Sequence, residues 1–544
     1  MSSSRSLARN SAVMAAGSLV SRVLGVVRQA LIVMIFGRTL AGEAWSVANT
    51  LPNTVFLLLA GGAINAVLVP QISKAMQRED GGSDFIDRLL TLAFVGLTVV
   101  TAACIALVPA LVRLFSDTDF DPAAHNLAVA FAFIAMPAVF FYGLYAILGQ
   151  VLNAREAFGW FSWAPVLCNV VWILGLGSFL ALYGRRLGSP EEYTPAMIAL
   201  LAGSLTVGVA LQALVLIVPL WRSGFRYRPR FGFRGVGLGS ASRVAVWTFA
   251  ALVVSQVALV VQSRVLTSVA DGDSGKLAYD SAFMLFMTPH GLITVSLVTA
   301  LFTSMSRAAA AGDTPQVRSE VGHGLRVIGA TVIPVTVGGL VLGTSLTTLI
   351  FSGPSLETGN AIGYVMMAML VGLPFYGAFY VVQRAFYAHE NAKTPFWLQL
   401  VSSGVFVVLG LACYLATSEY RAVAVAGAQA VSNIGAAALA IVWLRAHLGG
   451  LDLHVVVRTW VRSLVAALPA GAIAAAIALP MRRFGAPLLP GPSDGMWLAS
   501  AFGLALAGTA FVACYLLLAR RMHITEVDEF TAPVLRRLRG VFTR

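Results

Sequence analysis

The stretch LVSRVLGVVRQALIV (19–33) returns 234 positions later as VVSQVALVVQSRVLT (253–267), each time inside a long apolar run. The two copies pair Ser21 with Ser255, Val23 with Val257 and Val27 with Val261. At nearly the same spacing, Ile72-Ser73-Lys74 matches Met305-Ser306-Arg307, and Gln150 matches Gln383. An even number of apolar runs separates the copies, so both would enter a membrane in the same sense. This predicts two parallel six-helix bundles related by an axis along the membrane normal, as in many transporters.

The composition places these runs in a membrane. Of the 544 residues, 58% are hydrophobic and 11% charged, with a mean hydropathy of +0.82. A soluble domain has about 25% charged residues. A membrane-spanning helix needs about 20 apolar residues. Suitable stretches lie at 10–37, 45–73, 88–114, 126–150, 161–183, 197–221, 243–270, 281–305, 325–351, 361–387, 396–416, 421–444, 457–480 and 496–519. The sequence therefore predicts an all-α integral membrane protein with about fourteen transmembrane helices.

The duplication also predicts the domain organisation. We expect an N-terminal six-helix lobe (1–225), a C-terminal six-helix lobe (226–450), a two-helix appendage (451–520) and a cytoplasmic tail (521–544). The Arg-rich loop at 221–243 would be the hinge between the lobes.

The formal charge of +13 sets the orientation rather than indicating nucleic acid as a partner. Most Lys and Arg lie in alternate short loops, richest at 221–243, whereas opposite loops hold acidic groups such as Asp117 and Asp271. This alternation predicts a protein of the inner (cytoplasmic) membrane with both termini in the cytoplasm. The exceptions to the pattern are Arg185, Arg186, Arg482 and Arg483.

Arginines inside the predicted spans are the candidate binding residues. Arg22 lies near the middle of the first span, Arg28 about two turns later, and Arg264 in the seventh. A charge at the centre of a spanning helix costs about 2.5–3.5 kcal/mol. Snorkelling to an interface is the alternative, chiefly for Arg28 and Arg264. Because guanidinium binds phosphate oxygens bidentately, a wet cationic cavity that binds a phosphate is the preferred interpretation.

Kinks are predicted in two spans. Pro52 precedes Asn53 in the second, followed by Gly61 and Gly62, and Pro289 lies in the eighth. Proline frees a carbonyl and bends a helix, so these residues form either a static kink or a gating bend. Asn53 is a candidate hydrogen-bonding group of the cavity.

Carboxylates are scarce within the spans, which argues against a cation-coupled exporter and against a membrane glycosyltransferase. Glu43 is the nearest candidate, and we expect it to be a solvated loop residue. The histidines lack metal-ligand spacing, and the cysteines form no CxxC pair and are expected to act as small buried hydrophobes. We therefore expect a transporter rather than an enzyme, with no metal and no cofactor.

The chain resembles the MurJ (MviN) lipid II flippases of the multidrug/oligosaccharidyl-lipid/polysaccharide exporter superfamily. The resemblance rests on SRVLGVVR (21–28), LPN (51–53) with VPQIS (69–73), ILGQVLNAREAFGWFSWAP (147–165) and RAFYAHENAKTP (384–395). It implies a fourteen-helix plan and gives Arg22 and Arg28 the positions of the essential first-helix arginines.

The chain also departs from that family. Members often have Asp at Glu43, Arg at Phe56 and Glu at Gly61, and their eighth helix carries an Asp-Arg pair and a Glu that SAFMLFMTP (281–289) lacks. Arg264 is then a candidate to replace the lost cation.

The resemblance implies a lipid II flippase, which moves the undecaprenyl-diphosphate-linked peptidoglycan precursor outward by alternating access, driven by the membrane potential. The tail of the lipid would follow a groove along helices thirteen and fourteen. The expected partners are lipid II and membrane lipids, with cell-wall synthesis or division proteins as further candidates. Two alternatives stay open: a flippase for another polyprenyl-diphosphate-linked saccharide, and a membrane scaffold that binds anionic lipid head groups.

Overall fold

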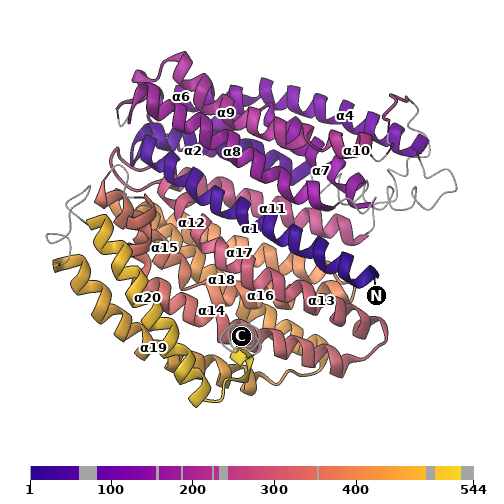
Figure 1. Ribbon diagram of the computed structural model, residues 1–544, viewed down its shortest axis with the longest axis vertical. Helices are drawn as coiled ribbons and strands as arrows, with labels where there is room; N and C mark the ends of the chain where they lie inside the picture. The colour runs from indigo at the N-terminus through magenta and orange to yellow at the C-terminus, as the bar shows by residue number, and fades with distance from the viewer. Residues whose placement is uncertain are drawn as a thin grey trace. The chain divides into compact units, whose positions relative to one another are not determined.

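The structure is a computed structural model, and it describes residues 2–59, 83–154, 158–185, 188–222, 224, 226–231, 243–351, 355–484 and 496–528 (Figure 1). Every regular element in these ranges is a helix. The chain divides into two compact units, Met1–Leu277 and Ala278–Arg544.

Unit 1 contains ten α-helices among the described residues. They are α1 (Ser2–Phe36), α2 (Leu40–Leu59), α4 (Ser83–Ala106), α5 (Val108–Phe115), α6 (Pro122–Ala135), α7 (Ala138–Ala154), α8 (Phe158–Tyr183), α9 (Pro195–Leu214), α10 (Ile217–Arg222) and α11 (Arg243–Thr267). A short 3-10 turn, η2 (Pro190–Glu192), precedes α9. Helices α6 and α9 each begin with proline, and the side chains of Asp121 and Thr194 cap them.

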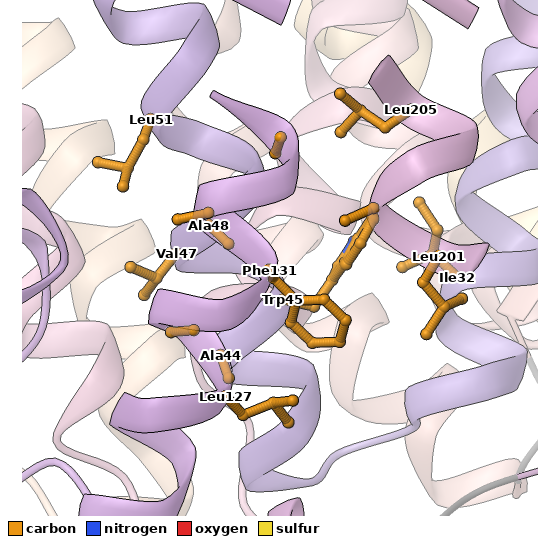
Figure 2. Close-up of a cluster of buried hydrophobic side chains, with 14 of the residues drawn as sticks. Ile32, Ala44, Trp45, Val47, Ala48, Leu51, Leu127, Phe131, Leu201 and Leu205 are labelled. Carbon is orange, nitrogen blue, oxygen red and sulfur yellow. The ribbon is translucent and has the colours of Figure 1, made fainter. Parts of the chain in front are cut away.

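A cluster of large aromatic side chains forms the core of unit 1. The rings of Phe36 and Trp45 stack at 5.6 Å, and Phe131 meets Trp45 edge to face at 5.3 Å. Figure 2 shows side chains of α1, α2, α6 and α9 meeting around Trp45 and Phe131. This core holds the last turns of α1, and helix α8 packs along the rest of α1.

Unit 2 begins within α12 and continues to the end of the chain. Its α-helices are α12 (Lys276–Pro289), α13 (Val295–Ala310), α14 (Thr314–Phe351), α15 (Leu356–Leu370), α16 (Leu373–Ala388), α17 (Lys393–Ala412), α18 (Ser418–Leu448), α19 (Leu453–Phe484) and α20 (Met496–Arg521). A π-helix, η3 (His290–Thr294), joins α12 to α13, and a 3-10 turn, η4 (Cys413–Leu415), follows α17. Helices α15 and α16 bend by 45° at their junction.

Helices α19 and α20 lie side by side and pack on α14 (Figure 1). Small residues of α19, among them Ala466 and Ala470, are fully buried in this contact. The indole of Trp460 donates to the Leu325 carbonyl at 2.8 Å, and the Tyr515 hydroxyl donates to the Ala330 carbonyl at 2.6 Å. The last two long helices are thus fastened to unit 2 by packing and by hydrogen bonds.

The all-α membrane prediction is confirmed. Each of the fourteen predicted spans is helical wherever it is described, although Pro109 and Pro137 break two of them into helix pairs. Twelve described helices or helix pairs are long and apolar enough to cross a membrane, and the bent pair α15–α16 would be a thirteenth. Part of the second predicted span, 45–73, lies outside the described residues. The count of fourteen, the parallel repeat and the domain boundaries therefore stay predictions.

Candidate functional site

Arg28 lies on the face of α1 that packs against α8. Its Nη1 donates a hydrogen bond to Oδ1 of Asn169 at 2.9 Å. The guanidinium carbon is 4.1 Å from the ring centroid of Trp172, within the range of a cation–π interaction. Asn169 and Trp172 are three positions apart on α8, so they share one face of that helix. We call Arg28, Asn169, Trp172 and Ser21 the arginine cradle.

The amide of Asn169 is oriented by a second set of bonds. Its Nδ2 donates to the carbonyl oxygen and to the hydroxyl of Ser21, both at 3.1 Å. The donors of the amide therefore face Ser21, and its acceptor faces Arg28. Asn169 is buried, so water does not compete for these bonds. The position of the Arg28 guanidinium is consequently set by the fold before any ligand arrives.

The cradle has more hydrogen-bond donors than acceptors. Nε of Arg28 and Nε1 of Trp172 are both buried and have no partner. Nη2 of Arg28 makes no bond to a described residue and is not fully buried. In the part of the chain that the structure describes, no carboxylate lies within ion-pair distance of Arg28. Since buried polar groups are nearly always paired, a surplus of donors around a cation indicates an anionic ligand rich in acceptors.

Arg22 is in a different state from Arg28. Its side chain is exposed and forms no hydrogen bond or ion pair with the described residues. Six positions separate the two arginines, so at about 3.6 residues per turn they point to different sides of α1. One arginine of the first helix is therefore held in place, and the other is free to move.

The other predicted binding residues lie apart from the cradle. Arg264 is half-buried, and its Nη1 donates to the Arg113 carbonyl at 3.3 Å, at the end of α5. This bond satisfies one of the carbonyls that a helix end leaves open. Asn53 is exposed on α2. Neither residue contacts Arg28 among the described residues.

The predicted kinks are partly described. Pro52 is buried inside α2, and Pro289 is the last residue of α12, directly before the π-helix η3. Gly61 and Gly62 lie outside the described residues. A π-helix is a common feature of functional sites, and here it follows the predicted proline.

The expectation that Glu43 is solvated was wrong. Glu43 is buried in the first turn of α2, with 3% of its surface exposed. Its carboxylate accepts from the backbone N–H groups of Lys276, by a short bond, and of Leu277, at 3.3 Å. These are the open N–H groups of the first turn of α12, where a helix favours a negative charge. Nearby, Asp271 accepts from the backbone N–H of Leu40 at 3.0 Å.

Arg482 had broken the predicted charge pattern, and its contacts give a reason. Its Nη2 donates to Oδ1 of Asn360 at 2.7 Å, and its Nη1 donates to the hydroxyl of Thr344. The arginine thus binds α19 to α14 and α15. It belongs to the packing of unit 2, and a rule about loop charges does not apply to it. The side chains of Arg186 and Arg483 lie outside the described residues.

The cysteines agree with their predicted role as small apolar residues. All four are free, and Cys168 and Cys413 are buried. Among the described residues, no group of three or more His, Cys, Asp or Glu could hold a metal ion.

Sequence reasoning missed Asn169 and Trp172. The available signal was a polar residue inside an apolar run, WAPVLCNVVW (163–172), where an amide needs a partner. The run alone does not say that the partner is Arg28, because that contact joins helices 141 positions apart.

A comparison with protein families now identifies the fold. The family model for "Lipid II flippase MurJ" matches residues 32–490. The chain belongs to this family. Family membership and the many apolar helices together make it a multi-pass membrane protein from a family of transporters.

Curated relatives lead to the same family. A "Probable lipid II flippase MurJ" of Synechocystis sp. is 27% identical over 456 residues, covering 83% of this chain and 84% of that protein. The "Lipid II flippase MurJ" of Burkholderia cenocepacia is 27% identical over 407 residues, covering 73% and 76%.

Solved structures share the fold. A lipid II flippase MurJ in an inward closed conformation matches with a TM-score of 0.71 and 19% identity, covering 94% of this chain and 99% of that one. An inward-facing multidrug resistance transporter of the MATE family, from the MOP superfamily, matches with a TM-score of 0.64 and 14% identity, covering 78% and 94%. At these identities the likeness concerns the fold alone.

Proposed function

We propose that this protein is a lipid II flippase that moves the polyprenyl-diphosphate-linked precursor from the cytoplasmic to the outer leaflet. The observation that carries the proposal is the arginine cradle: a cation held between two helices, with surplus donors and no carboxylate among the described residues. A diphosphate supplies the missing acceptors and charge, and guanidinium matches its oxygens in geometry.

The two first-helix arginines would have different tasks. Arg28 is pre-organised by Asn169 and Trp172, so little side-chain entropy is lost when a phosphate binds. Arg22 is exposed and unbonded among the described residues, so it can follow the diphosphate as the headgroup moves. No covalent bond forms or breaks in this process. The protein would lower the free energy of the charged headgroup within the bilayer.

The wider arrangement is part of the same proposal. The lobes 1–225 and 226–450 would alternate in access around a central cationic cavity, while 451–520 would guide the lipid tail and 521–544 would form a tail in the cytoplasm. Both termini would be cytoplasmic, as the loop charges predict. Cell-wall synthesis or division proteins would supply or consume the substrate.

The membrane potential would supply the energy. The cytoplasm is electrically negative, so a headgroup with two net negative charges moves outward down the potential. Each charge gains about 2.3 kcal/mol per 100 mV, or about 4–5 kcal/mol for two. That favours the outer leaflet by roughly three powers of ten. The scarcity of carboxylates within the spans agrees with transport that needs no coupling cation.

Proteoliposomes with headgroup-labelled lipid II would test the function. We expect flipping that stops when the potential is collapsed and persists when sodium or the proton gradient is removed at constant potential. Equal turnover of other polyprenyl-diphosphate glycolipids would favour the broader flippase alternative. Binding of anionic lipids with no turnover of any glycolipid would favour the scaffold. A strict sodium or proton requirement would overturn the proposed energy source.

A further inference from the structure

Unit 2 contains a second arginine that aromatic rings hold in place. Nη2 of Arg384, near the end of α16, donates to the hydroxyl of Tyr380 at 2.6 Å. The guanidinium carbon lies 4.8 Å from the ring of Tyr380, 5.7 Å from that of Phe302 on α13 and 5.9 Å from that of Tyr387. The side chain is half-buried. Three rings on two helices therefore limit how far this guanidinium can move.

The charge of Arg384 is not neutralised by the described residues. No carboxylate lies within 4 Å of it there, whereas Arg326 of the same unit pairs with Glu526 at 2.8 Å. Its Nε and Nη1 make no bond to a described residue, and neither is fully buried. Arg384 therefore presents two N–H edges outward from a fixed ring setting. Two donors on one edge of a guanidinium are what a phosphate accepts.

The ring that positions Arg384 is itself supported from behind. His290, buried in the π-helix η3, meets the ring of Tyr380 edge to face with centroids 5.4 Å apart. The ring of Tyr376 lies 4.5 Å from His290 on its other contact. Tyr380 is thus held between the π-helix and Arg384. This order, from a buried core to a half-exposed cation, is that of a pre-organised binding group.

We propose that Arg384 is a second phosphate-binding group of the protein, with Tyr380 as its positioning residue. The inference rests on the proposed function and adds a contact to the diphosphate of the lipid substrate from unit 2. A phospholipid head group offers the same phosphate chemistry, so the test separates the two sources. A surface arginine that only snorkels would need neither the hydroxyl bond nor the rings of three aromatic residues.

The test uses the full chain in phosphatidylcholine nanodiscs and measures the affinity for labelled lipid II. Arg384→Ala should weaken binding by about ten- to a hundredfold, the loss of one or two charge-assisted hydrogen bonds. Arg384→Lys keeps the charge without the fork and should weaken binding less, by roughly three- to tenfold. Arg307→Ala is the matched control, because Arg307 is exposed on α13 and bonds only to the Thr303 carbonyl of its own helix. The control should bind as the wild type does.

A double-mutant cycle tests the role of Tyr380. Tyr380→Phe removes the hydroxyl and keeps the ring, so binding should weaken by about two- to fivefold. In the Arg384→Ala background the same change should have no further effect, because Tyr380 acts through Arg384. A role in stability alone would leave the effect of Tyr380→Phe unchanged in both backgrounds. That result would overturn the positioning role.

Further outcomes separate this inference from the proposed function. If Arg28→Ala loses lipid II binding while Arg384→Ala binds as the Arg307→Ala control does, the function stands and the Arg384 site is wrong. If Arg384→Ala lowers retention of anionic phospholipid but not lipid II affinity, the phosphate belongs to the membrane and the substrate contact is wrong. If the wild type binds no lipid II, both proposals fail. Thermal unfolding checks folding, and Arg384→Lys stays informative if the alanine variant unfolds.

Discussion

Arg28 in unit 1 and Arg482 in unit 2 are both arginines inside membrane-spanning helices, yet their surroundings differ. Arg28 has one bonded nitrogen, one buried nitrogen without a partner, and an indole ring beneath it. Arg482 donates from both terminal nitrogens to side chains of two neighbouring helices. Arg28 is left with donors that the described protein does not satisfy, whereas the bonds of Arg482 are made within its own unit.

The difference teaches how to distinguish two uses of a costly charge. An arginine that joins helices stabilises the fold, because removing it leaves partners such as Asn360 unsatisfied. An arginine with surplus donors adds little to packing and is better explained by a ligand. If this interpretation is correct, substitutions at the two sites should separate transport from stability.

Arg28→Ala should have the largest effect. Removing a buried, hydrogen-bonded charge from a binding interface costs about 2–5 kcal/mol, so transport should fall by roughly thirtyfold or more. The protein should remain folded in the membrane, because Arg28 has no charged partner among the described residues. Lipid II flipping in proteoliposomes, together with thermal unfolding of the same sample, measures both quantities. Loss of folding in step with loss of transport would remove the distinction between the two arginines.

Arg22→Ala should come next, with transport reduced by about ten- to a hundredfold, because an exposed cation contributes charge-assisted bonds only when substrate is bound. Arg22→Lys should be less impaired, since ammonium keeps the charge and lacks the bidentate fork. Complementation by each variant as the only copy in cells checks this. Normal growth with Arg22→Ala would contradict a cationic substrate cavity.

Asn169 offers a way to neutralise Arg28 without touching it. Asn169→Ala should reduce transport by about tenfold, because Nη1 of Arg28 loses its acceptor. Asn169→Asp should be worse, although it gives Arg28 a stronger bond, because the new carboxylate cancels the charge that the phosphate needs. Transport assays of the two variants side by side measure this order. The reverse order would mean that Asn169 serves the packing of α1 on α8.

Arg482→Ala should have the smallest effect on transport, within about twofold of the wild type, and a measurable one on stability. The hydroxyl of Thr344 and the amide of Asn360 lose a charged donor, which should lower the free energy of unfolding by about 1–3 kcal/mol. Arg520→Ala is the control, since Arg520 forms an exposed pair with Asp528 at 3.8 Å and should change stability little. Thermal unfolding in detergent compares the two variants.

The first helix shows where sequence reasoning succeeds. A run of apolar residues longer than the bilayer is thick must be helical, because no other backbone satisfies its own hydrogen bonds in lipid. The spans follow from this rule alone, and so does the suspicion that Arg22 and Arg28 are costly. The quoted motifs also led to the family, whose model covers residues 32–490.

Contacts between helices lie beyond this kind of reasoning. Glu43 has the same sequence neighbours whether it is solvated or buried, and only the nearby first turn of α12 makes burial favourable. Arg482 likewise looks like an exception until Asn360 and Thr344 are placed beside it.

Hydropathy and motif therefore determined the class of this protein, its helices and the arginines worth attention, because these depend on short-range chemistry and on the solvent. Tertiary structure decided which arginine is held and which is free, since that depends on the face each helix turns toward its neighbour. Arg28 meets Asn169 from 141 positions away, and no local pattern records that meeting.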